Sequence, residues 1–138
     1  MRVFLPSCVA DIQGLLGQAE LPSRVGYAAN PQWALNQDDQ DPEYLEEVLL
    51  YTAAAQSLES NPENTGRIVI VVEMPAIEID TQAGLVEVAG FSQKQIQALF
   101  ADDLTNKTAI LAGQDMTELD LTWFGPTEIL EFSDFLGQ

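Results

Sequence analysis

The chain has 138 residues, with 22 Asp and Glu against 5 Lys and Arg, a formal net charge of −17, no His and one Cys. This composition excludes an internal disulfide, and it excludes metal sites and catalytic dyads or triads that depend on His. The negative charge argues against direct binding of nucleic acid, because phosphates would be repelled.

Hydrophobic residues make up 46% of the chain, which is enough for a folded core. At this length we expect one domain that spans residues 1–138. The longest apolar run, residues 68–72, is far shorter than a membrane span, and the first residues lack the apolar stretch of a signal peptide. We therefore expect a soluble, cytoplasmic protein with no membrane contact.

The first forty residues predict one strand and two helices. Residues 2–5 are rich in apolar residues and precede a proline, which is typical of a short strand. Apolar residues recur at helical spacing over 8–19. Residues 21–29 are predicted to be an irregular link. An Asn-Pro pair then starts a short helix over 31–36, which contains Trp33.

The middle of the chain predicts the main core elements. Asp41 precedes a proline and starts a helix over 42–59 that is apolar around much of its circumference. Residues 67–74 are largely β-branched and predict a central strand buried on both faces. A further strand over 85–89 makes the segment 67–89 an expected antiparallel hairpin with an irregular middle.

Short elements fill the last third of the chain. They are a helix over 93–97, a helix over 105–112 that Asp103 caps, a half-buried strand over 119–124 and a final helix over 127–136. Residues 98–101 either extend the first of these helices or begin a strand.

This order of elements suits an α+β fold, a two-layer sandwich in which helices pack on one face of a mixed or antiparallel sheet of about four or five strands. A ferredoxin-like core is one specific version. It requires a strand at 99–102 and an enlarged helical crossover formed by residues 30–60. Small sheets often pair through an edge or a face, so a homodimer is a further expectation.

Four segments in this order carry a family resemblance: Met-Arg-Val-Phe-Leu-Pro at 1–6, Tyr-Leu-Glu-Glu at 44–47 before Ala-Ala-Ala-Gln-Ser-Leu at 53–58, Leu-Phe-Ala-Asp-Asp at 99–103, and Leu-Thr-Trp-Phe at 121–124 before Glu128 and Ile129. Together they resemble an uncharacterised family of short, acidic actinobacterial proteins, known only as a domain of unknown function. The resemblance implies no catalytic residue. It favours a strand over 98–102.

An acidic cluster of six carboxylates lies within residues 38–47, with no base among them. One interpretation is a solvated loop followed by acids that favour a helix start. The other is a Ca²⁺ or Mg²⁺ site, although the glycine and the distal Glu of a calcium loop are missing. Trp33, which lies nearby, is the aromatic residue most expected to be exposed. The candidate partner-binding residues are Trp33, Asp38, Asp39 and Asp41.

Asp102 and Asp103 follow an apolar segment, where carboxylates often bind a metal ion or take part in catalysis. The same pair is equally typical of a turn and a helix cap. Cys8 has no His to act as its base, and we interpret it as a small buried apolar residue.

The sequence thus favours a small acidic, non-enzymatic module without a cofactor, which binds a basic protein partner or a small ligand. Binding to a basic partner is expected to weaken with salt. The alternative is a carboxylate-based enzyme that depends on a divalent metal held by Asp102 and Asp103.

Overall fold

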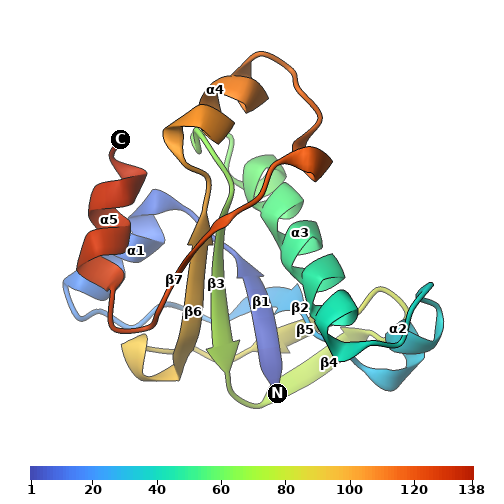
Figure 1. Cartoon of the computed structure of the whole chain (residues 1–138). Coiled ribbons are helices and arrows are strands. Elements are labelled where there is room, and N and C mark those ends of the chain that lie inside the picture. Colours follow the sequence, from blue (N-terminus) through green and yellow to red (C-terminus); the bar gives the residue numbers. More distant parts are fainter.

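The β-branched run Ile68–Glu73 forms the strand β3 near the middle of one seven-stranded sheet. The structure, a computed structural model, describes all of residues 1–138 (Figure 1). The other strands are β1 (Arg2–Pro6), β2 (Arg24–Tyr27), β4 (Ala76–Asp80), β5 (Leu85–Val88), β6 (Ile96–Ala101) and β7 (Thr122–Phe124). Their order is β4-β5-β2-β1-β3-β6-β7, and every neighbouring pair is antiparallel.

Five helices accompany the sheet: α1 (Val9–Leu16), α2 (Pro31–Leu35), α3 (Pro42–Ser60), α4 (Leu104–Leu111) and α5 (Ile129–Leu136). The predicted start signals are confirmed, because the Asn30 side chain caps α2 and the Asp41 side chain caps α3. Short 3₁₀ turns lie at Gln93–Gln95 and Met116–Glu118. No helix combines the length and the apolar content that crossing a bilayer would need.

Both faces of the sheet carry a hydrophobic core. On one face, α3 packs over β1 and β3, where Phe4, Val69 and Val71 meet Leu49 and Ala53. On the opposite face, α1 and α5 pack together over the alternate residues of the same strands (Figure 1). The α+β class is confirmed, but the predicted sheet of four or five strands with helices on one face is wrong. A continuous apolar strand such as β3 needs cover on both sides.

The expected pairing within 67–89 is also corrected. The hairpin is formed by β4 and β5, and β5 pairs on its other side with β2 rather than with β3. Strand β2 lies in the segment that we predicted to be an irregular link. Its four residues have little apolar periodicity, and their extended conformation follows from pairing with β1 and β5. The strand favoured over 98–102 is confirmed as β6.

The ferredoxin-like version is not matched. In a split β-α-β unit, a third strand separates the two strands that a helix connects, but β1 and β2, connected by α1, pair directly. One split β-α-β unit does occur, and it is formed by β2 and β3. Strands β2 and β3 are both antiparallel to β1 and therefore run parallel on either side of it. The helices α2 and α3 connect them, which is the enlarged crossover expected over 30–60.

Candidate functional site

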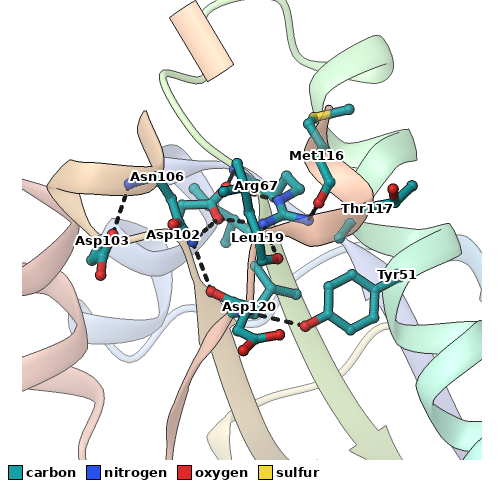
Figure 2. Close-up of polar contacts among 12 residues, drawn as sticks. Tyr51, Arg67, Asp102, Asp103, Asn106, Met116, Thr117, Leu119 and Asp120 are labelled. Carbon is teal, nitrogen blue, oxygen red and sulfur yellow. Dashed lines mark hydrogen bonds and ion pairs between the residues drawn. The ribbon is translucent and has the colours of Figure 1, made fainter. Parts of the chain in front are cut away.

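Asp102 lies in the turn between β6 and α4, and it is fully buried. The pairing of Ile68 with Ala101 brings Arg67 beside it at the end of two neighbouring strands. Asp102 Oδ1 accepts a hydrogen bond from Arg67 Nη2 at 2.6 Å, and its Oδ2 accepts from Arg67 Nε at 2.9 Å and from the Arg67 backbone N–H at 2.8 Å (Figure 2). The result is a buried, bidentate ion pair.

The remaining donors of Arg67 hold the segment before β7. Nη1 donates to the carbonyl of Met116 at 3.2 Å, and Nη2 donates to that of Leu119 at 2.8 Å. The guanidinium also lies over the ring of Tyr51, 5.6 Å from its centroid. Tyr51 Oη accepts from the backbone N–H of Leu121 at 3.2 Å. Arg67 therefore ties this segment to both the sheet and α3.

Asn106 completes the surroundings of Asp102. Its Nδ2 donates to Asp102 Oδ1 at 2.9 Å and to the carbonyl of Asp120 at 2.7 Å. The two oxygens of Asp102 thus accept four hydrogen bonds in all, which is the full capacity of a carboxylate. The geometry leaves Asp102 no free lone pair for a metal ion.

Asp103 follows Asp102 in the sequence but has a different structural role. Its Oδ1 accepts from the backbone N–H of Asn106 at 2.8 Å, which confirms the predicted cap of the helix that is α4. No three side chains among Cys, Asp and Glu gather closely enough to hold a metal ion. The divalent-metal hypothesis stays a prediction that the surroundings of Asp102 do not favour.

The acidic segment at the start of α3 is exposed. Asp41 Oδ1 accepts from the backbone N–H of Glu43 at 2.9 Å, and Asp39 Oδ1 accepts from that of Asp41 at 2.9 Å. Asp38, Asp39 and Asp41 all face solvent. Two of the three acids therefore order the loop and the helix start, as the solvated interpretation predicts.

Trp33 does not have the exposure that we expected. Only 6% of it is accessible, and it belongs to the core cluster under α3, together with Phe4 and Leu45. The ring lies over Gly84, where an added Cβ would come within 3.2 Å of the indole. Gly84 has no side chain, which makes room for the ring. The local sequence pattern could not predict the burial of Trp33, because the contact joins two distant segments of the chain. Trp33 thus lies in the core next to the acidic loop and exposes little surface to a partner.

Most of the few basic side chains are already engaged. Arg2 pairs with Glu46, Arg24 pairs with Asp11, and Arg67 pairs with Asp102. Lys107 is buried, and its Nζ donates to the carbonyls of Leu136 and Gln138 at the end of α5, both at 3.0 Å. Lys94 alone is exposed and has no carboxylate within ion-pair distance. The acidic side chains therefore greatly outnumber the unpaired basic ones.

Cys8 and Tyr27 both line a hollow of about 490 Å³ between α1 and the end of α3. Burial raises the pKa of the Cys8 thiol, and the nearby charge of Asp11 adds to the rise. Burial also raises the pKa of Tyr27, with a further contribution from Glu59. Both groups are therefore neutral at pH 7, and Cys8 is half-buried rather than fully buried as expected.

Arg67 is the key residue that sequence reasoning missed, because its carboxylate partner lies 35 positions away. The available signal was a lone arginine directly before the apolar run 68–72, where a buried charge needs a partner.

The sequence comparisons assign the chain to a family but do not indicate an activity. A family model described as a family of unknown function, DUF6912, matches residues 1–132. The chain belongs to this family. The DUF6912 match includes all seven strands and α1 to α4, so it covers the whole sheet and the Arg67–Asp102 pair. No curated protein and no solved structure matches the chain.

Proposed function

We propose that this DUF6912 member is a small acidic, non-enzymatic module of the cytoplasm that binds a basic partner protein. The observation that carries the proposal is how the five cationic side chains are paired. Four are engaged in ion pairs or on a helix terminus, so Lys94 is the one exposed basic side chain without a carboxylate within ion-pair distance. An unopposed negative field attracts positively charged partners and accelerates their association.

The arrangement of the acids also supports binding over catalysis. Asp102 is saturated with hydrogen bonds, Asp103 and Asp41 cap helices, and Cys8 is held in its weakly nucleophilic neutral form. The exposed acids Asp38, Asp39 and Asp41 are the proposed contact residues. Trp33 is the buried support that fixes α2 beside them.

The test is capture of partners by the tagged protein from a lysate of its own host, read by mass spectrometry at about 0.01 M and about 1 M salt, where the screening length falls from ~30 Å to ~3 Å. We expect one dominant basic protein at low salt and its release at high salt. A partner that stays bound at high salt, or no partner at all, would contradict the proposal.

A matched pair of variants locates the contact. Asp38→Asn/Asp39→Asn/Asp41→Asn removes three charges, and it keeps the cap of α3 because Asn is an equally good N-cap. Glu63→Gln/Glu131→Gln/Asp134→Asn removes three exposed charges elsewhere. The first variant should lose the captured protein and the second should retain it. Equal retention would remove the acidic loop from the contact.

A further inference from the structure

On the face of the sheet that α3 covers, α3 reaches only as far as β2, and no helix packs over β4 and β5. Val86 and Val88 of β5 are buried in the core under α1 and α5, so Glu87 between them points to the opposite face. Val25 of β2 and Ile77 of β4 lie directly opposite Glu87, one on each side, and therefore share its face. Val25 is 42% exposed and Ile77 is 71% exposed.

A second row lies beside this one, because Tyr27 and Asp80 both pair with Leu85. We call the six residues of the two rows the open sheet face: Val25, Tyr27, Ile77, Asp80, Leu85 and Glu87. The 490 Å³ hollow reaches its β2 side, and a second hollow of about 430 Å³ is lined by Ile77 and Glu87. The face is thus apolar and hollowed, with two carboxylates set into it.

Glu87 has no cation of its own. Its one hydrogen bond comes from the hydroxyl of Ser23 at 3.4 Å, and no basic side chain lies within ion-pair distance. A carboxylate between two exposed aliphatic side chains is complementary to a lysine or arginine that is flanked by apolar residues.

The width of the open sheet face matches one helix. Strands β2 and β4 lie on either side of β5, so they are two strand spacings apart, or about 10 Å. This is roughly the diameter of an α-helix with its side chains. On the same side of the sheet, α3 packs over β1 and β3 and contacts the near strand β2, so a docked helix would lie beside α3 over β5 (Figure 1).

We propose that the open sheet face docks a basic amphipathic helix of the partner protein. Apolar residues of that helix lie on Val25 and Ile77, and its lysine or arginine pairs with Glu87. The inference rests on the proposed function and specifies the contact surface. A hydrogen bond between Thr81 Oγ1 and Gln32 Oε1 ties the β4–β5 turn to α2. The acidic loop that follows α2 can therefore meet further basic residues of the same partner.

Charge decides against a second copy of this chain as the occupant. Each copy carries a net charge of −17 and would bring its own Glu87 and Asp80 to the contact. Like charges directly opposite each other disfavour association.

The experiment uses a synthetic 18-residue leucine–lysine amphipathic helix as the probe, with fluorescence anisotropy for affinity and amide NMR shifts for location. The face variant is Ile77→Ser/Glu87→Gln. The control, Leu130→Ser/Glu131→Gln, removes the same charge and an exposed aliphatic side chain from α5. We expect the face variant to bind about tenfold more weakly and the control less than about twofold. The shifts should concentrate in β2, β5 and β4.

Equal weakening in both variants, or equal binding of a scrambled peptide of the same composition, would overturn the docking site and leave the general attraction for basic partners intact. No binding of any basic peptide at low salt would overturn the proposed function as well. A dimer in sedimentation that Ile77→Ser dissociates would assign the face to a second copy. If the face variant loses its fold, Glu87→Gln against Glu131→Gln makes the same comparison.

Discussion

Arg67 and Asp102 are the two halves of an ion pair that is closed to solvent, with 2% and 0% of their side chains exposed. Arg67 alone supplies three of the four hydrogen bonds to the carboxylate, one from its backbone and two from its guanidinium. The backbone N–H of Asp102 in turn donates to the carbonyl of Arg67 at 3.3 Å. The pair fastens the end of the sheet to the segment that precedes β7.

Loss of one partner from this pair should be costly. Asp102→Asn leaves the guanidinium of Arg67 buried without its counter-charge, and we expect a loss of about 3–5 kcal/mol of unfolding free energy. Urea denaturation measures it. Asp103→Asn is the matched control, because it changes the neighbouring carboxylate but keeps a residue that caps α4, and it should cost less than about 0.5 kcal/mol. Similar losses in the two variants would refute the structural role of the pair.

The saturation of Asp102 leads to a prediction about divalent cations. Because its four acceptor positions are filled, sub-millimolar Mg²⁺, Mn²⁺ or Ca²⁺ should leave the melting temperature unchanged. Differential scanning fluorimetry with each ion checks this. A clear rise with one ion that Asp103→Asn abolishes would restore the alternative of a metal-dependent enzyme.

Two glycines should respond to alanine in opposite directions. At Gly26 in β2, a Cβ would lie 2.6 Å from Leu5 Cδ2 and 2.8 Å from the carbonyl oxygen of Phe4. Gly26→Ala should therefore destabilise the protein by about 1–3 kcal/mol or more. At Gly14 in α1, the nearest atom would be Leu21 Cδ2 at 3.5 Å, so Gly14→Ala should stabilise by about 0.5–1 kcal/mol. Thermal and urea unfolding of both variants decide the matter, and a tolerated Gly26→Ala would mean that β1 and β2 pack less closely than described.

Alkaline pH should weaken the fold through Tyr27. Burial and Glu59 raise its pKa above the ordinary value of 10.0, so the native state holds this proton more tightly than the unfolded chain does. The resulting stability is complete below the unfolded pKa and is lost as the pH rises from that value through the native pKa. Urea midpoints at about pH 8 and about pH 10.5 should differ more in the parent protein than in Tyr27→Phe. If the urea midpoint shifts by the same amount between the two pH values in both proteins, Tyr27 does not contribute to the loss of stability at alkaline pH.

Local patterns in the sequence predicted several elements well. The β-branched run of β3, the Asp-Pro start of α3 and the cap at Asp103 each act within a few residues, so local chemistry specifies them. The strand β2 and the pairing of β5 with it depend on residues far away in the chain, and local pattern did not find them.

The candidate site divides in the same way. The sequence by itself determined that this is an acidic protein with no His chemistry, because charge balance and residue types are independent of the fold. The α+β class followed from the local strand and helix patterns. Only the tertiary structure decided which charges are neutralised. It buries Arg67 against Asp102, buries Trp33 against Gly84, and places Glu87 between Val25 and Ile77 on the open sheet face. Burial and pairing are properties of residues that meet in space, so they follow from the sheet order and register rather than from neighbours along the chain.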